Sequence, residues 1–216
     1  MNTKAIIFDL DGVITDTAKY HYAAWKQLAD ELNMYFDEEI NERLKGVSRM
    51  QSFEIILEVN NSLDKFTNEE KEKLITKKND NYIELIKQIT PDDILPGISD
   101  FINEAKNNKL KLAVASVSKN AQTVLESLQV LDLFDYIADA KKITKSKPDP
   151  EIFLVCAQAL GIEPKYCVGI EDAQAGIEAI KAAGMYAIGL NVTITSIEPD
   201  LHLKSSSELI FNNVIN

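Results

Sequence analysis

The chain has 216 residues, of which 45% are hydrophobic and 26% charged, a composition typical of a folded protein of one or two domains. Its formal net charge of −11 argues against nucleic acid or an anionic membrane as a general partner, because the mean field repels both. The sequence has no apolar run near the ~20 residues of a membrane span and no leader pattern. We therefore expect a cytoplasmic enzyme or binding protein with a small-molecule partner. The sequence does not give the oligomeric state, and a monomer is the expectation.

The first predicted element is a short buried strand over residues 5–8, which ends in two carboxylates. The stretch AIIFDLDGVITDT places Asp9 directly after the apolar run and Asp11 one residue later, before Gly12. Carboxylates this close repel each other and are costly to bury. A cation, or a chemical role, should therefore lie nearby.

The next segment, residues 16–92, is predicted to be entirely helical. Tyr22, Trp25 and Leu28 share one face of a helix at helical spacing. A second helix is expected to start at Asp37, a third to cover residues 52–59, and Thr67 with Glu70 to form a capping box for a long helix through residue 87. These residues are predicted to form a helical domain inserted after the first strand, with candidate hinges near residues 15–16 and 90–93.

The remaining residues, 93–216, alternate between short apolar strands and amphipathic helices. The predicted strands cover residues 111–116, 136–139, 167–172 and 187–190, with a last, weak one over 209–213. The predicted helices cover residues 99–108, 120–129, 150–161 and 173–184. This alternation predicts an α/β fold, a doubly wound parallel sheet formed by residues 1–15 and 93–216.

Polar side chains follow the predicted strands at the edge where ligands bind to open α/β sheets. They are Asp9, Asp11, Ser116, Lys147, Glu171 and Asp172. Any one of these carboxylates alone could be a helix cap or a turn former. Four together need a cation, and Mg²⁺ prefers carboxylate oxygens combined with a substrate phosphate. A second carboxylate can then act as a nucleophile on phosphorus and a third as a proton carrier.

The segments DLDGVITDT, Ser116, KSKPDP and GIED resemble, in this order, the four motifs of haloacid dehalogenase-type phosphotransferases. The resemblance covers the whole chain and implies that residues 16–92 form the α-helical cap domain of that superfamily. It implies that Asp9 is the nucleophile, Asp11 the general acid/base, and Ser116 and Lys147 the holders of the phosphoryl group. It also implies a Mg²⁺ site formed by Asp9, the Asp11 carbonyl, Glu171 and Asp172.

Within the insert, DGVITDTAKYHYAAW, LKGVSR and KKNDNY resemble mutase members of the superfamily. This resemblance implies interconversion of β-glucose 1-phosphate and glucose 6-phosphate through β-glucose 1,6-bisphosphate. It implies that His21 and Thr17 help to place Asp11 and that a set of further residues binds the sugar phosphate. That set is Trp25, Lys45, Gly46, Val47, Ser48, Arg49, Lys77, Ser118, Lys119 and Asn120.

Several alternatives remain open from the sequence. Arg49 and Lys77 could be solvated helix cations, His21 a helix surface residue and Trp25 part of a helix core. A sugar-phosphate phosphatase would share the core motifs but would not need a second phosphate site. A mutase of β-linked disaccharide phosphates is a close variant, whereas an inactive phosphosugar-binding regulator conflicts with an intact Asp9 and Asp11.

Overall fold

The computed structural model describes residues 2–44 and 47–215, and it divides into two compact units. Unit 1 comprises residues up to 16 together with residues from 89 onward, and unit 2 comprises residues 17–88. In the described part of the chain, no helix is long and apolar enough to cross a membrane. Lys45 and Gly46, two of the predicted sugar-phosphate contacts, lie outside the described residues.

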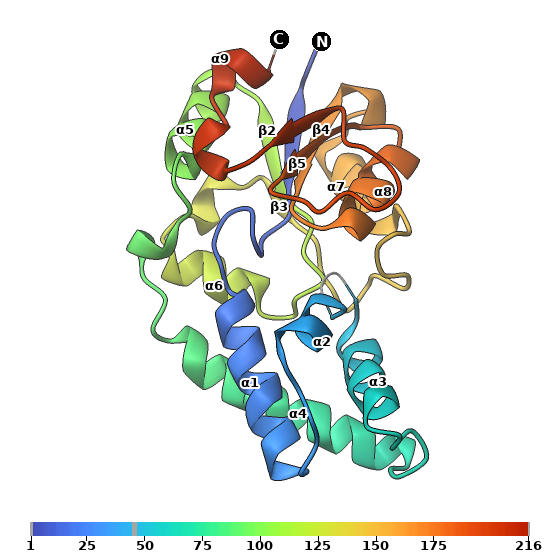
Figure 1. Ribbon diagram of the computed structural model, residues 1–216. Helices are drawn as coiled ribbons and strands as arrows, with labels where there is room; N and C mark the ends of the chain where they lie inside the picture. The colour runs from blue at the N-terminus through green and yellow to red at the C-terminus, as the bar shows by residue number, and fades with distance from the viewer. Residues whose placement is uncertain (1, 45–46, 216) are drawn as a thin grey trace. The chain divides into compact units, whose positions relative to one another are not determined.

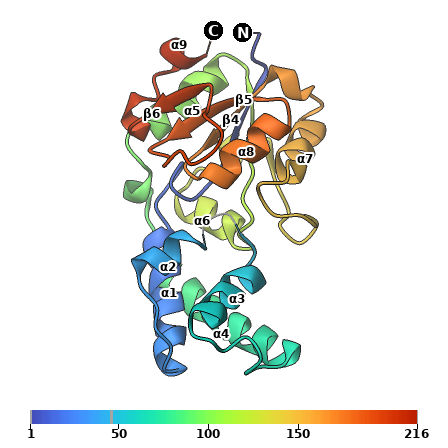
Figure 2. The same cartoon turned by 45° about the vertical axis from the view of Figure 1, so that its right-hand side comes forward.

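Unit 1 is built on a six-stranded sheet in which every neighbouring pair is parallel (Figures 1 and 2). The strand order is β3-β2-β1-β4-β5-β6, which places β1 in the interior. The strands are β1 (Ala5–Phe8), β2 (Lys111–Val114), β3 (Tyr136–Ile137), β4 (Cys167–Glu171), β5 (Tyr186–Leu190) and β6 (Leu201–Leu203). The predicted parallel α/β sheet is confirmed.

Helices cover both faces of this sheet. They are α5 (Ile98–Asn107), α6 (Ala121–Ser127), α7 (Glu151–Leu160), α8 (Gln174–Ala182) and the short α9 (Phe211–Val214). Ile7 of β1 packs in one cluster with Phe153 of α7 and Ile180 of α8. Phe8, on the opposite face, makes an edge contact with Phe101 of α5 at 6.1 Å between ring centroids. Alternate residues of β1 are therefore buried on opposite faces, as a doubly wound sheet requires.

The C-terminal segment differs from the expectation. Residues 209–213 were predicted to form a strand, but the last strand is β6 and α9 covers part of the segment. Phe211 and Val214 are both buried, and their spacing of three residues places them on one helix face. A helical turn buries both side chains, whereas a strand would direct them to opposite faces.

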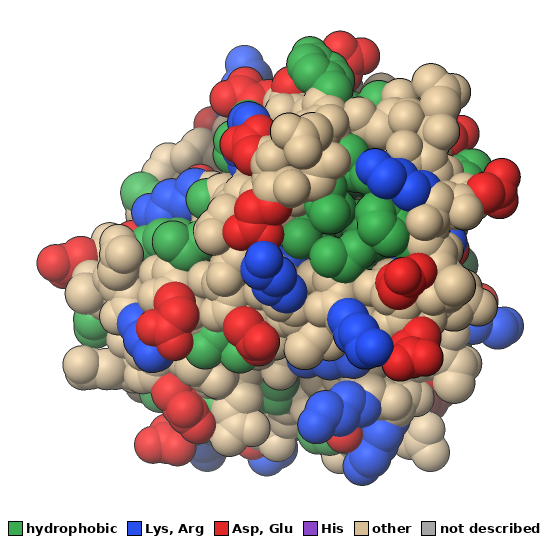
Figure 3. All heavy atoms as spheres, turned by 90° about the horizontal axis from the view of Figure 1, so that it is seen from below, with side chains coloured by type: hydrophobic (Ala, Val, Ile, Leu, Met, Phe, Trp, Pro, Cys, Tyr) green, Lys and Arg blue, Asp and Glu red, His purple; other side chains and the backbone are tan. Residues whose placement is uncertain are grey.

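Unit 2 contains helices and no strand among its described residues. The helices are α1 (Ala18–Glu31), α2 (Glu38–Glu42), α3 (Arg49–Val59) and α4 (Asn68–Ile86). Asp37 caps α2 by accepting from the Ile40 amide, and Thr67 with Glu70 forms the predicted capping box of α4. On the face drawn in Figure 3, positively and negatively charged side chains are intermixed around a group of hydrophobic ones. This face is therefore neither uniformly positive nor uniformly negative.

Candidate active site

Register in the sheet aligns the polar ends of three strands. Phe8 of β1 lies opposite Val114 of β2 on one side and Ile170 of β4 on the other. Asp9, the residue after β1, and Glu171, the last residue of β4, therefore lie at the same level, and Ser116 follows β2 two residues beyond Val114. The side chains that the sequence placed at one sheet edge are brought together by this register.

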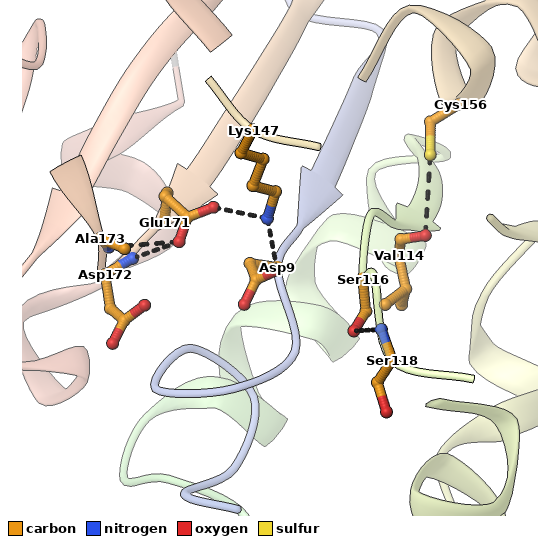
Figure 4. Close-up of polar contacts among 9 residues, drawn as sticks. All are labelled: Asp9, Val114, Ser116, Ser118, Lys147, Cys156, Glu171, Asp172 and Ala173. Atoms are coloured by element: carbon orange, nitrogen blue, oxygen red, sulfur yellow. Dashed lines mark hydrogen bonds and ion pairs between the residues drawn. The ribbon is translucent and has the colours of Figure 1, made fainter. Parts of the chain in front are cut away.

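Lys147 joins two of these carboxylates from a loop between β3 and α7. Its Nζ lies 2.6 Å from Asp9 Oδ1 and 2.8 Å from Glu171 Oε2 (Figure 4). All three side chains are buried, with Lys147 only 4% exposed as a residue. Burial opposes the charged ammonium, but Asp9 and Glu171 outweigh it and raise the pKa of Lys147. Lys147 therefore remains a cation and partly neutralises the pair.

Negative charge still exceeds positive charge at this site. Burial raises the pKa of Asp9 to about 7 despite the opposing attraction of Lys147. Burial also raises the pKa of Glu171 and raises that of Asp11 well above its usual range, the latter with added repulsion from Asp9 and Asp172. A single lysine thus does not balance four carboxyl groups, and a further cation would be stabilised here.

Three of the carboxyl groups have the spacing of a metal site. Oxygen atoms of Asp9, Glu171 and Asp172 all lie within 4.8 Å of one another. Two glycines leave room for these groups. A Cβ on Gly12 would come within 2.1 Å of Asp172 Oδ2, and one on Gly176 within 1.9 Å of Glu171 Oε2. An all-oxygen donor set with this surplus of negative charge fits Mg²⁺.

Glu171 is also tied to the backbone that follows it. Its Oε1 accepts from the amides of Asp172 and Ala173 at 3.1 and 3.2 Å, while its Oε2 accepts from Lys147 (Figure 4). Both carboxylate oxygens are therefore engaged. Glu171 thus holds the turn that carries Asp172 in place, a positioning effect added to any contact with a metal.

Asp11 sits on a tight loop after β1. Its Oδ1 is buried and has no hydrogen-bond partner among the described residues. A buried carboxylate oxygen without a partner is costly, and the raised pKa of Asp11 favours the protonated acid. A neutral carboxylic acid beside a candidate nucleophile can donate a proton to a leaving oxygen.

Ser116 and the residues after it form a chain of side-chain to backbone hydrogen bonds. Ser116 Oγ accepts from the Ser118 amide at 3.2 Å, and Ser118 Oγ accepts from the Asn120 amide at 3.3 Å (Figure 4 shows the first). The amides of Ser118 and Asn120, just before α6, are therefore already engaged by side-chain oxygens. Lys119 is exposed and keeps its charge available at the same loop.

In unit 2, two of the predicted residues pack against aromatic rings and a third is exposed. His21 stacks on Tyr82 at 4.0 Å between ring centroids, and Trp25 stacks on Phe53 at 6.2 Å. Lys77 forms an exposed ion pair with Glu31 at 2.6 Å. The structure thus pairs Lys77 with another surface residue and places Trp25 in the helical core.

The other predicted residues of unit 2 lie at helix starts. Ser48 caps α3, in a capping box with Gln51, and Arg49 is the first residue of that helix. Val47 precedes them in a bend and is half-buried. Thr17 occupies the N-cap position of α1, but its side chain makes no capping hydrogen bond.

Lys78 is a buried cation that the sequence interpretation missed. Its Nζ lies 2.9 Å from His21 Nδ1 and 4.8 Å from the centre of the Trp25 ring. An ammonium group has only donors, so His21 Nδ1 accepts this hydrogen bond and its proton is on Nε2. The helical spacing of the sequence could have indicated this burial, because Lys78 lies on the same face of α4 as the buried residues Ile75 and Tyr82.

We expect His21 to make the protein sensitive to mild acid. Burial, then Lys78 and Arg49, lower the pKa of His21 well below its ordinary value. The unfolded chain therefore takes up a proton near pH ~6.5 that the folded chain rejects, and stability should fall as pH falls through that value. His21→Gln should lose less of its free energy of unfolding than the wild type between about pH 7 and pH 5.5, measured by urea unfolding.

The matched control is His202→Gln, because His202 is exposed on β6. It should keep the acid sensitivity of the wild type. An identical pH dependence in His21→Gln and the wild type would show that the pKa of His21 is the same in the folded and the unfolded chain, and would contradict the expectation.

Comparison with known proteins assigns the chain to a family. The model of the haloacid dehalogenase-like hydrolases matches residues 3–184. A β-phosphoglucomutase of Bacillus subtilis (strain 168) is 47% identical over 95% of this chain and 91% of its own length. A phosphorylated carbohydrates phosphatase of Thermotoga maritima is 32% identical over 86% of this chain and 83% of its own length.

Solved structures agree with the sequence comparisons. A crystal structure of a β-phosphoglucomutase from Clostridium difficile matches with a TM-score of 0.93 and 46% identity, covering 98% of this chain and 95% of that one. The range matched by the family model includes the sheet edge with Asp9, Lys147 and Glu171. The chain therefore belongs to the haloacid dehalogenase-like hydrolase family, with β-phosphoglucomutases among the relatives that match nearly all of its length.

Proposed function

We propose that this protein interconverts β-glucose 1-phosphate and glucose 6-phosphate through an aspartyl-phosphate on Asp9 and β-glucose 1,6-bisphosphate. The observation that carries the proposal is the buried contact of Asp9 with Lys147, in a chain that resembles a β-phosphoglucomutase over 95% of its length. A buried carboxylate held 2.6 Å from an ammonium is oriented for attack, and the ammonium can stabilise charge on a transferring phosphoryl group.

The first half of the reaction starts from the phosphorylated Asp9. The C6 hydroxyl of β-glucose 1-phosphate attacks phosphorus, and the bond between phosphorus and the Asp9 oxygen breaks. Asp11 accepts the proton of the hydroxyl, which leaves the bisphosphate and a free Asp9 carboxylate. The raised pKa of Asp11 makes it a strong enough base to accept this proton when it is ionised.

The second half reverses the roles at the other end of the sugar. The Asp9 carboxylate attacks the C1 phosphate of the bisphosphate, and the bond between phosphorus and the C1 oxygen breaks. Asp11 returns its proton to that oxygen, which gives glucose 6-phosphate and restores phosphorylated Asp9. One carboxyl group therefore serves as base and then as acid, a role that suits its shifted pKa.

A metal ion completes the charge balance of the proposal. We assign Asp9, the Asp11 carbonyl, Glu171 and Asp172 to hold Mg²⁺, on the basis of the three carboxyl groups whose oxygens lie within 4.8 Å. Bound Mg²⁺ supplies charge neutralisation of the phosphoryl oxygens. Ser116 and Lys147 are assigned to the same phosphoryl group from the other side.

A mutase also needs a site for the phosphate that is not reacting, and each unit offers candidate groups. Arg49 at the start of α3 provides a guanidinium that can bind phosphate through two parallel hydrogen bonds. Burial lowers its pKa, but a guanidinium remains charged at neutral pH. Ser118, Lys119 and Asn120 are the candidates in unit 1, with Lys119 as the exposed cation.

A sugar-phosphate phosphatase is the second candidate. The 32% identity to a Thermotoga maritima phosphorylated carbohydrates phosphatase favours it, because the same core residues can pass the phosphoryl group to water. The two activities give different products, which are glucose 6-phosphate for the mutase and free phosphate for the phosphatase. The deciding experiment supplies β-glucose 1-phosphate, Mg²⁺ and trace β-glucose 1,6-bisphosphate, and measures glucose 6-phosphate and free phosphate separately. A mutase forms glucose 6-phosphate with little free phosphate, and the reverse result supports the phosphatase.

Arg49→Ala should shift the phosphoenzyme from sugar transfer toward hydrolysis. Phosphorylation of Asp9 by acetyl phosphate needs no second phosphate site, so its rate should be unchanged. Transfer to β-glucose 1-phosphate should slow by roughly 10–100-fold, because a charge-assisted contact to phosphate is lost. The measurement is the partition of labelled phosphoenzyme between bisphosphate and free phosphate.

Arg43→Ala is the control for this experiment, because Arg43 pairs with Glu58 on the exposed surface at 3.0 Å. It should partition like the wild type. If Arg49→Ala does so too, Arg49 is a surface cation and the phosphatase gains support.

A further inference from the structure

Thr15 joins two chain segments that are far apart in sequence. Its hydroxyl donates to the carbonyl of Asp93 at 2.7 Å, and the residue is 1% exposed. The backbone reinforces this contact, since Thr15 forms an antiparallel bridge with Ile94 and the Leu95 amide donates to the Ile14 carbonyl at 2.9 Å. The segment that returns to unit 1 is thus bound to the segment that leaves it.

The same residue closes the loop that carries Asp11. The Gly12 amide donates to the Thr15 carbonyl at 2.9 Å, and the Thr15 amide donates to the Leu10 carbonyl at 3.2 Å. A parallel bridge also connects Asp11 with Thr15. Thr15 therefore contacts the Asp11 loop through its backbone and the returning segment through its side chain.

The returning segment is itself held in a defined turn. Asp93 Oδ2 accepts from the Thr90 amide at 2.9 Å, and the Asp93 amide donates to the Thr90 carbonyl at 2.9 Å. Asp93 ends a 3-10 turn over Pro91–Asp93 that Thr90 precedes, a few residues after the boundary at residues 88–89. The Asp93 carbonyl is thus a fixed acceptor whose position depends on the path of the chain as it leaves unit 2.

We propose that Thr15 is a positioning residue for proton transfer by Asp11, a role that rests on the proposed mutase function. The hydroxyl of Thr15 fixes the Asp11 loop to the returning segment, so the placement of Asp11 depends on that segment. The backbone bonds alone can preserve the fold, because Val has nearly the shape of Thr and suits the same extended backbone. What Val removes is the 2.7 Å hydrogen bond from the Thr15 hydroxyl to the Asp93 carbonyl, and with it the side-chain link between the Asp11 loop and the returning segment.

The test measures two phosphoryl-transfer steps separately in Thr15→Val: phosphorylation of Asp9 by acetyl phosphate, and transfer from Asp9 to the sugar phosphate. Acetyl phosphate should phosphorylate Asp9 at the wild-type rate, because acetate is a good leaving group and needs no acid from Asp11. Single-turnover transfer from phosphorylated Asp9 to β-glucose 1-phosphate should slow by about fivefold to tenfold, the equivalent of one neutral hydrogen bond. Thr15→Ser keeps the hydroxyl and should restore the wild-type rate.

Two further variants keep the test decisive. Thr76→Val removes a hydroxyl that donates to the Glu72 carbonyl at 2.8 Å on the exposed face of α4. This control should change neither the phosphorylation by acetyl phosphate nor the transfer to the sugar phosphate. If Thr15→Val does not fold, Asp93→Ala weakens the same link from the partially exposed turn, and should slow sugar transfer selectively. The inference would be overturned if Thr15→Val and Asp93→Ala transferred the phosphoryl group to the sugar at the wild-type rate. It would also be overturned if they slowed this transfer and the phosphorylation by acetyl phosphate equally. Failure of the wild type to form bisphosphate would instead refute the mutase function.

Discussion

Asp9→Asn should abolish turnover and prevent formation of any phosphoenzyme. The amide has the shape of the carboxylate but is not a nucleophile, and the loss of a covalent nucleophile costs on the order of 10⁴–10⁶-fold in other enzymes. The fold should persist, because Lys147 keeps its contact with Glu171 at 2.8 Å. Intact-mass measurement after incubation with acetyl phosphate and Mg²⁺ should show one added phosphoryl group on the wild type and none on Asp9→Asn.

Asp11→Asn is the matched control, since it alters the neighbouring carboxyl group and keeps the nucleophile. Its sugar transfer should slow by roughly 10²–10⁴-fold through loss of acid/base assistance. It should still accept a phosphoryl group from acetyl phosphate, so the acyl-phosphate should accumulate. A phosphoryl group found on a serine or histidine, or retained by Asp9→Asn, would exclude the aspartyl-phosphate mechanism.

The core of the fold could be predicted because its strands are short apolar runs bounded by turn residues. A strand buried on both faces has no alternating pattern, and the run at residues 5–8 followed by carboxylates is typical of the interior of a parallel sheet. β6 escaped prediction because it has only three residues and exposes His202. Such an edge strand is determined by pairing with β5, a tertiary effect with little local signal.

The site could be predicted where residues follow strands, and less well where they lie on helices. Strand order places Asp9 and Glu171 at one edge whatever the loops do. For a residue on a loop the strand order is not enough. Lys147 lies 138 positions from Asp9 in the sequence, and only the conformation of its loop decides their contact. On α4, Lys77 and Lys78 are adjacent in sequence, and the helix rotation of about 100° per residue buries one and exposes the other. A motif of the form KK leaves that choice open.

Lys147→Met should destabilise the protein in a manner that grows with pH. Methionine has a similar length and no charge, so Asp9 and Glu171 would face each other without their shared cation. Removal of one partner from a buried ion pair typically costs about 3–5 kcal/mol. Burial already raises the pKa values of Asp9 and Glu171, and loss of Lys147 should raise both further, because the charge of Lys147 is the largest influence that lowers them. Protonation can then relieve the repulsion in mildly acidic solution.

The direction of this pH dependence follows from the number of protons bound in the folded and unfolded states. A carboxyl group whose pKa is raised in the folded state binds more protons folded than unfolded, so stability falls as pH rises through that range. The stability deficit of Lys147→Met relative to wild type should therefore be small near about pH 5.5 and largest near about pH 8. Urea unfolding in excess chelator measures it without compensation by a divalent cation. Single-turnover transfer should also slow, by roughly 10²–10³-fold, because a preorganised cation is lost from the phosphoryl group.

Lys145→Met provides the comparison two residues away. Lys145 pairs with Asp149 at 3.3 Å, and its side chain is 69% exposed, so this pair should contribute little to stability at any pH. The two variants remove the same charge from the same loop and differ only in burial. If both lose equal stability, with no dependence on pH, then the positive charge of Lys147 is not what holds Asp9 and Glu171 together. The orientation of Asp9 for attack would then need another source, because no other ammonium or guanidinium lies against it in the described part of the chain.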